Sequence, residues 1–418
     1  MNKLCILALA VLAGAAPALL AQRETPLDVE VRAAYGTVEK AREAMAGEVE
    51  DEERRGLMES YRRACLDFVG RYEGRADSLT VGRYDLARAY VDLQEPAKAA
   101  KHLEAFLSAA PTHAEADRAR LFLGDCYRSM SRLEDARKLY ADFAARSKNA
   151  ELLPFAKLGL ATSLYLDLRF DEAIAAYGAV MKEFPEHQVA GDAAFQLTDA
   201  LVNGGKYEEA RRHLATLLEE AKDAPELLER QKILALLGQP FRELEGVKRW
   251  IGAEDSSIER QGGRVVVLCF FMNNNIPSTQ VLQFLSELDR STTGQPVTFW
   301  GVTKAYKAGR HPDWSLDTEA KWLKRYRADP RFVLQRELRA APKSEEEEFW
   351  KDLEKPITIP IALAEGFENH RAYEVRGVPC VVVIDRAGKI RMIEQGGQPV
   401  GGFQTRLISQ TVRRLAAE

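Results

Sequence analysis

The sequence GRVVVLCFF at residues 263–271 decides the fold of the last third of the chain. A glycine followed by a short, continuous run of apolar and β-branched residues is typical of a strand that is buried on both faces. The polar segment MNNNIPS at 272–278 interrupts this run and predicts an exposed turn. A helical spacing follows in the apolar residues Val281, Leu282, Leu285 and Leu288. The predicted order is therefore strand, turn, helix.

A second buried strand is predicted about a hundred residues later, in the sequence VRGVPCVVVIDRAGKI at 375–390. It begins at Val-Pro and ends in an Asp-Arg-x-Gly turn. Together with residues 263–278, this pattern resembles the thioredoxin fold, and most closely the TlpA-type periplasmic thiol-disulfide oxidoreductases. The resemblance covers roughly residues 238–418. It implies an α/β thioredoxin-like domain at 237–418.

The TlpA-type family carries Trp-Cys-x-x-Cys in the turn, and its two cysteine positions fall on Asn275 and Ser278 here. Dithiol exchange needs a thiolate and a second thiol one helical turn away. Asparagine cannot form a thiolate, a serine hydroxyl cannot form a disulfide, and no histidine lies in the turn to activate that hydroxyl. We therefore expect no catalytic residue here, only two vestigial motif positions without redox activity.

Pro379 is the residue for which the resemblance makes the most specific structural prediction. In the family the equivalent proline is cis, and it places the backbone of the preceding residue, here Val378, beside the turn, where extended peptides dock. The alternative is an ordinary trans proline at the start of a strand. We expect the cis form and predict a binding site at Asn274, Asn275, Val378, Pro379 and Cys380. Asn275 is also expected to cap the following helix.

Two cysteines occupy positions where the family has other residues. Cys380 replaces the usual threonine, and Cys269 replaces a buried acid or amide six residues before the first motif position. Both are expected to be small core residues. The alternative is a Cys269–Cys380 pair across neighbouring antiparallel strands, for which we expect proximity but no bond. An alternative function follows: a thiol-disulfide oxidoreductase or peroxiredoxin-like enzyme acting through Cys380 alone.

The middle of the chain repeats with a constant step. Four alanines are spaced by 37 residues each, because 136−99, 173−136 and 210−173 are all 37: Ala99, Ala136, Ala173 and Ala210. A small residue lies twelve positions earlier in three units, with Thr198 as the exception, and a leucine or tyrosine lies four positions later: Ala87, Gly124 and Ala161, then Leu103, Tyr140, Tyr177 and Leu214. This frame is similar to the tetratricopeptide repeat.

The repeat resemblance implies an all-α solenoid over residues 80–236, preceded by a helical cap at 27–75. Such arrays commonly hold a peptide or protein partner on a concave face. That face is expected to carry side chains from the first helix of each unit, such as Arg83, Asp125, Lys157 or Asp199. The sequence does not separate binding residues from solvated charges.

The N-terminal segment predicts where the protein is located, and the composition narrows the kind of partner that it binds. Residues 1–21 combine Lys3 with an apolar core and small-residue cleavage points, which predicts a signal peptide and a periplasmic or secreted protein. An N-terminal membrane anchor is the alternative.

The net charge of −4 over 418 residues gives no reason to expect nucleic acid as a partner. Six scattered histidines and the absence of any CxxC predict no metal and no cofactor.

A long insert separates the two halves of the thioredoxin-like pattern. Residues 304–356 contain several aromatic residues and an acidic run at 345–348, and their role stays open at this point. Taken together, the sequence predicts an exported, redox-inactive thioredoxin-like protein. Its repeat scaffold and its proline-loop cleft are expected to bind a peptide or protein partner of the cell envelope.

Overall fold

The computed structural model describes residues 24–45, 51–147, 149–254, 256–305, 315–338, 350–351, 353–397 and 401–418. The predicted signal peptide at 1–21 lies outside these ranges. The described chain forms two compact units that divide between Ala200 and Leu201, and each is treated by itself. Within the described ranges, no helix is both long enough and apolar enough to cross a membrane.

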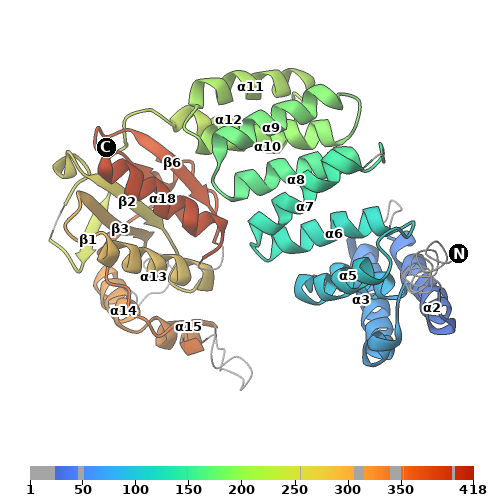
Figure 1. Cartoon of the computed structure of the whole chain (residues 1–418). Coiled ribbons are helices and arrows are strands. Elements are labelled where there is room, and N and C mark those ends of the chain that lie inside the picture. The colour runs from blue at the N-terminus through green and yellow to red at the C-terminus, as the bar shows by residue number, and fades with distance from the viewer. Residues whose placement is uncertain are drawn as a thin grey trace, which may run out of the picture. The chain divides into compact units, whose positions relative to one another are not determined.

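The first unit consists of helices that follow one another in antiparallel pairs (Figure 1). The N-terminal pair is joined to the repeats by a short 3₁₀ helix, Glu73–Ser78. The helices are α2 (Pro26–Glu43), α3 (Asp51–Tyr72), α4 (Arg83–Asp92), α5 (Pro96–Ala109), α6 (Ala116–Ser129), α7 (Leu133–Arg146), α8 (Leu153–Leu166), α9 (Phe170–Glu183) and α10 (Val189–Asn203). The predicted solenoid is confirmed. Since α4 contacts α6 and α6 contacts α8, we infer that the first helices of the repeats line its inner face.

Close contact between helices explains the small residues of the repeat. The Tyr140 side chain of α7 is fully buried between Gly124 of α6 and Gly159 of α8. A Cβ atom on Gly124 would lie 2.7 Å from Cε1 of the tyrosine ring, and one on Gly159 would lie 2.6 Å from Cζ. The four repeat alanines are likewise fully buried. The aromatic ring thus fills the gap that the small residues leave between neighbouring helices.

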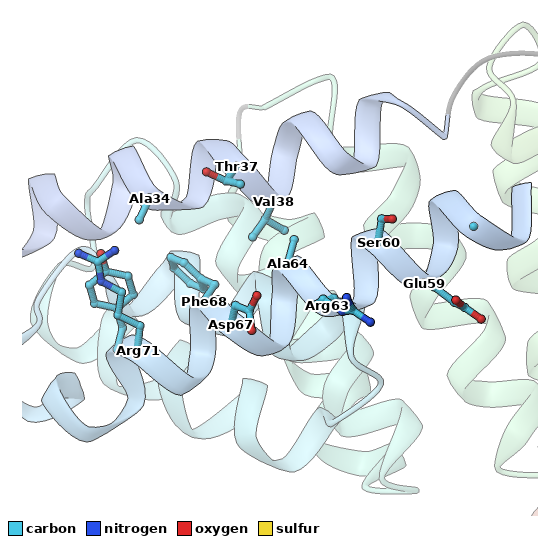
Figure 2. Close-up of a pocket in the computed structure, with 12 residues that line it drawn as sticks. Ala34, Thr37, Val38, Glu59, Ser60, Arg63, Ala64, Asp67, Phe68 and Arg71 are labelled. Atoms are coloured by element: carbon cyan, nitrogen blue, oxygen red, sulfur yellow. The ribbon is translucent and has the colours of Figure 1, made fainter. Parts of the chain in front are cut away.

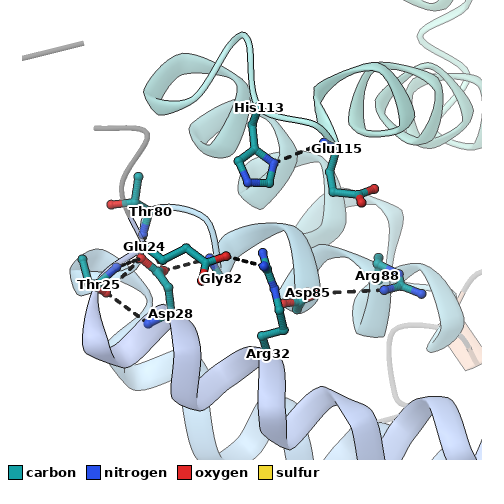
Figure 3. A network of polar contacts seen from close by, with 10 residues as sticks. All are labelled: Glu24, Thr25, Asp28, Arg32, Thr80, Gly82, Asp85, Arg88, His113 and Glu115. Atoms are coloured by element: carbon teal, nitrogen blue, oxygen red, sulfur yellow. Dashed lines mark hydrogen bonds and ion pairs between the residues drawn. The ribbon is translucent and has the colours of Figure 1, made fainter. Parts of the chain in front are cut away.

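A buried carboxylate fixes the N-terminal helix pair to the first repeat (Figure 3). The Asp28 carboxylate of α2 accepts hydrogen bonds from the backbone N–H groups of Thr25, Thr80 and Gly82, and from the Thr25 hydroxyl, at 2.8–3.0 Å. Thr80 and Gly82 directly precede α4. Burial raises the pKa of Asp28, but these donors lower it more, so its net pKa lies below the usual value. Asp28 therefore caps its own helix and the entry to α4 together.

The second unit begins with two helices, α11 and α12, and continues into a six-stranded sheet with further helices around it (Figure 1). A short 3₁₀ helix, Glu259–Gln261, precedes the second strand. The elements are α11 (Tyr207–Glu220), α12 (Pro225–Leu236), β1 (Val247–Ile251), β2 (Val265–Phe270), α13 (Ile276–Ser291), β3 (Val297–Lys304), α14 (Leu316–Ala328), α15 (Pro330–Leu338), β4 (Ile361–Ala364), α17 (Glu368–Ala372), β5 (Cys380–Ile384), β6 (Ile390–Gln395) and α18 (Phe403–Ala417). The predicted strand, turn and helix are β2, residues 271–275 and α13.

The strand order is β1-β4-β3-β2-β5-β6. Strands β2, β3 and β4 are parallel to one another, whereas β5 runs antiparallel to β2 and β6 antiparallel to β5. Every residue of β2 is buried, as expected for a central strand covered on both faces. A parallel β-α-β unit followed by an antiparallel hairpin and a final helix is the thioredoxin-like fold, so the predicted fold class is confirmed.

Helices cover the two faces of this sheet differently. Helix α13 contacts β3 and α18, and α18 contacts β2, so these two helices share one face. A Cβ atom on Gly301 would point toward Phe271 and Leu282, which places Phe271 on the α13 face. Phe270, the preceding residue, packs against His370 and Tyr373 on the opposite face.

The predicted repeat region 80–236 extends into the second unit, because α11 and α12 are bound to the sheet. The Tyr207 hydroxyl of α11 donates to the carbonyl oxygen of Arg391 in β6 at 2.7 Å. After α12, the backbone N–H of Gly238 donates to the carbonyl of Ile390, and that of Ile390 donates back to Gln239. These backbone bonds pair the connection with β6, so the edge of the sheet is covered.

The repeat packing can be tested by enlarging one buried alanine. Ala173→Leu should lower the free energy of unfolding by about 1–3 kcal/mol, because the added atoms have no space between the helices. Ala175→Leu on the same helix is the matched control, since Ala175 is exposed and its variant should unfold like the wild type. Urea unfolding of both variants gives the comparison. Equal stability of the two variants would contradict the repeat register.

The Asp28 network predicts a dependence on pH. A carboxylate with a lowered pKa stabilises the folded state above the unfolded pKa of about 4, and this contribution is lost as pH falls through the folded pKa. Asp28→Asn should therefore lower the free energy of unfolding by about 1–3 kcal/mol at neutral pH. The difference from wild type should shrink in acid, whereas Asp142→Asn, at an exposed carboxylate, should have little effect at either pH. A difference independent of pH would contradict the role of the charge.

Candidate functional site

The turn after β2 is organised by the two residues at the vestigial motif positions. The Asn275 side chain accepts a hydrogen bond from the backbone N–H of Ser278 at 2.8 Å and caps α13, as the sequence predicts. Ser278 is fully buried, and its hydroxyl oxygen accepts the backbone N–H of Met272 at 3.4 Å. Within the described residues, the side-chain oxygen of Asn274 is buried without a hydrogen-bond partner. The polar groups at the two motif positions thus stabilise the turn itself.

The proline loop lies against this turn. The Val378–Pro379 peptide bond is cis, which confirms the prediction from the sequence. A Cβ atom on Gly397 would lie 2.9 Å from Cβ of Pro277 and 3.1 Å from Cγ of Pro379, so Gly397 sits between the turn and the loop. The end of β6 also holds the loop, because the backbone N–H of Gly396 donates to the Pro379 carbonyl at 2.8 Å.

Val378 presents backbone groups that the described chain leaves unused. Neither its N–H nor its carbonyl has a hydrogen-bond partner among the described residues, and the residue is half-buried. On either side of it the loop is fixed. Arg376 donates its backbone N–H to the Gln395 side chain and forms an ion pair with Glu229 of α12. An extended segment could pair with Val378 as with an exposed strand edge.

Cys269 and Cys380 lie on adjacent antiparallel strands and are both free, as predicted. Their register is offset, because Cys269 pairs with Val381 and Phe270 pairs with Cys380. Directly paired residues share a face and successive residues alternate, so the two thiols point to opposite faces of the sheet. Both are fully buried, and burial raises the pKa of each thiol well above its usual value. The absence of a bond follows from this orientation.

The insert between β3 and β4 covers the turn after β2. The Tyr326 ring of α14 stacks on Phe271, with ring centroids 5.9 Å apart, and its hydroxyl hydrogen-bonds to Thr279 at 2.7 Å. Ile276, inside the vestigial motif, packs against a buried cluster of the insert: Leu334, Trp350 and Leu353. The acidic run at 345–348 lies outside the described residues. Tyr326 carries no sequence signal that distinguishes it from the other aromatics of the insert.

The four charged residues that we expect on the concave face of the repeat array have interaction partners within the chain. Asp125 accepts from the Tyr140 hydroxyl and from Arg128, at 2.7 and 2.8 Å. Arg83 pairs with Asp77, and Lys157 pairs with Glu183. Asp199 also has an interaction. These contacts give each residue a structural use, and their role in binding stays a prediction.

An open groove lies between α2 and α3 at the N-terminal end of the array (Figure 2). Its volume is about 570 Å³. Val38 and Phe68 form an apolar floor, whereas Glu59, Arg63 and Asp67 supply both signs of charge at the rim. The groove therefore favours no single charge on a ligand.

Metal binding finds no support in the described part of the chain. There, no group of three or more histidine, cysteine, aspartate or glutamate side chains could hold a metal ion. The buried cysteines lie singly or on opposite faces of the sheet.

Comparisons with family models assign the helical region. Residues 84–151 and 167–230 match two family models described as tetratricopeptide repeat. The helical region is therefore a tetratricopeptide-repeat array, a class of scaffold that binds protein partners. A comparison with curated proteins gave no match.

Several solved structures are similar to the C-terminal part. They include a thiol-disulfide isomerase from Corynebacterium glutamicum (17% identity, 43% of this chain and 97% of that chain, TM-score 0.30). Others are a thioredoxin-family thiol:disulfide interchange protein from Chlorobium tepidum (14%, 43% and 96%, 0.27) and the exposed lipoprotein thioredoxin Etrx1 of Streptococcus pneumoniae (19%, 42% and 100%, 0.28). The thioredoxin-like assignment itself stands on the strand order and the proline loop of this chain.

The buried thiols predict a slow reaction with thiol reagents. Cys65, Cys126, Cys269 and Cys380 are all buried and free, so the native protein should react over hours at mildly alkaline pH. Denaturation without reductant should release four reactive thiols at once, or five if Cys5 is retained. Colorimetric thiol titration measures the reaction rate of the native protein and the number of thiols that denaturation releases. Rapid labelling of Cys380 in the native protein would contradict this account.

Proposed function

We propose that this protein binds a peptide or protein partner through the proline loop of a redox-inactive thioredoxin-like domain, with the repeat array as a second partner surface. The observation that carries the proposal is Val378. Its backbone N–H and carbonyl are unpaired within the described chain, next to the cis-proline and the capped turn. An extended segment of the partner would satisfy both groups by strand-like pairing.

The chemistry of the turn supports a role in binding without thiol exchange. Asn275 and Ser278 offer no thiolate, and both take part in holding the turn. The alternative, an enzyme acting through Cys380 alone, would need an accessible thiol of low pKa. Cys380 is fully buried with a raised pKa, which speaks against that alternative.

The repeat array supports a protein partner in general. We propose the first helices of the repeats as its binding face. We keep the predicted boundaries, with a helical cap at 27–75, repeats at 80–236 and the thioredoxin-like domain at 237–418. The segment 1–21 supports export to the periplasm or the exterior. A partner in the cell envelope follows from that location.

Site-specific photo-cross-linking tests the proposal. Pro277→p-benzoylphenylalanine places the reactive group on an exposed residue beside Gly397 and Pro379. Ala387→p-benzoylphenylalanine is the matched control, in the exposed turn between β5 and β6 at the opposite end of the strand. Irradiation in an envelope fraction should give a discrete adduct with the first variant alone. Adducts with both variants, or with the control only, would contradict docking at the proline loop.

A further inference from the structure

A buried histidine on the sheet face opposite α13 is not explained by the proposed function. His370 of α17 is 6% exposed, and within the described residues neither of its ring nitrogens has a hydrogen-bond partner. Its ring packs against Phe270 and Phe367, at centroid distances of 5.2 and 5.5 Å. A buried polar atom without a partner costs about 1–3 kcal/mol, so a core position of this kind would ordinarily hold an apolar residue.

A buried lysine shares this environment. Lys304, the last residue of β3, is only 7% exposed, and its Nζ atom lies 3.1 Å from the ring centroid of Phe367. Phe367 itself is 46% exposed, unusual for a large apolar residue of this domain. Burial, and after it the charge of Lys304, lower the pKa of His370 to about 4, so the imidazole is neutral at physiological pH. Lys304 also has an interaction within the chain, and its ammonium carries three donors. The two groups thus place one positive charge and one neutral N–H donor on the same face of the sheet.

The strand register places these groups at the same edge of the sheet as the proline loop. Phe270 pairs with Cys380 on one side and with Val302 on the other, so all three share the face that carries His370. Lys304 lies two residues beyond Val302 and therefore on that face too. The carbonyl of His370 accepts the backbone N–H of Val375, at the start of the loop, at 2.8 Å.

We propose that Lys304 and His370 form a subsite for a carboxylate group of the docked partner, covered in the free protein by the Phe367 ring. This rests on the proposed function and names the partner chemistry: an acidic side chain or a free C-terminus near the segment that pairs with Val378. The lysine ammonium neutralises the carboxylate, and the neutral imidazole donates its N–H to one oxygen. Rotation of the half-exposed Phe367 side chain opens the subsite.

Histidine NMR tests this subsite without knowledge of the natural partner. The full chain is labelled at histidine Cε1, and the His370 signal is identified by its loss in His370→Gln. Three blocked tripeptides are then titrated: Gly-Asp-Gly amide, Gly-Gly-Gly with a free carboxylate, and neutral Gly-Asn-Gly amide. Binding of a carboxylate should shift the His370 signal and raise the pKa of His370 by about one unit or more. The neutral peptide should do neither.

The three peptides distinguish the sources of the carboxylate. A response to the Gly-Asp-Gly peptide alone assigns the subsite to an acidic side chain, and a response to the free carboxylate alone assigns it to a C-terminus. No response of His370 to either acidic peptide overturns the subsite. That failure is distinct from failure of the proposed function, which the adduct at position 277 decides independently.

A pair of lysine variants separates a specific site from general charge attraction. Lys304→Met keeps the length of the side chain and removes its charge, and it should abolish the response of His370 to the acidic peptides. Lys248→Met is the matched control, because Lys248 is a half-exposed lysine of β1 that pairs with Glu365. That variant should respond as the wild type does. Equal loss in both variants, or an unchanged response in Lys304→Met, would overturn the proposal.

Discussion

The antiparallel pairing of β2 with β5 is the constraint on which the second unit depends. Because the two strands run in opposite directions, the turn that follows Phe270 and the proline loop that precedes Cys380 meet at one edge of the sheet. Gly397 lets them approach, since a side chain there would collide with Pro277 and Pro379. Val378, whose backbone groups have no partner among the described residues, lies at this edge together with the capped turn, Lys304 and His370 because of this single register.

The same arrangement in a thiol-disulfide oxidoreductase would expose a thiolate at the helix N-terminus. Here the helix N-terminus is capped by Asn275, which accepts a backbone N–H, and the same face of the sheet carries the buried Cys269. The insert covers the turn, because Tyr326 hydrogen-bonds to Thr279 and Ile276 packs against buried residues of the insert. Asn275, Ser278 and the insert hold the turn in place, and among the described residues the backbone groups of Val378 in the proline loop have no hydrogen-bond partner.

Much of the fold could be predicted because its signals are local. The apolar run of β2, the helical spacing after the turn and the 37-residue step of the alanines each reflect a periodicity within one segment. The cis form of Pro379 followed from the resemblance. Proximity of Cys269 and Cys380 could also be predicted, but their opposite orientation depends on a one-residue offset between strands that no local pattern reveals.

The remaining features depend on contacts between distant segments. Tyr326 over Phe271, and Tyr207 on the backbone of Arg391, join parts of the chain that share no repeat or motif. His370 lies in a short polar stretch of a kind that is typical of exposed helices, and only tertiary packing buries the His370 side chain. Such positions follow from the arrangement of the whole domain, so composition and spacing could not single them out.

The central claim, a thioredoxin-like fold that has lost thiol exchange, is tested most directly by insulin reduction. The wild-type chain should show no catalysed precipitation of insulin in the presence of dithiothreitol. The double variant Asn275→Cys with Ser278→Cys should gain measurable activity, because the start of α13 lowers the pKa of the first thiol. Insulin reduction by the wild type at the rate of a thioredoxin would contradict the account, whether or not Cys380→Ser abolishes that activity.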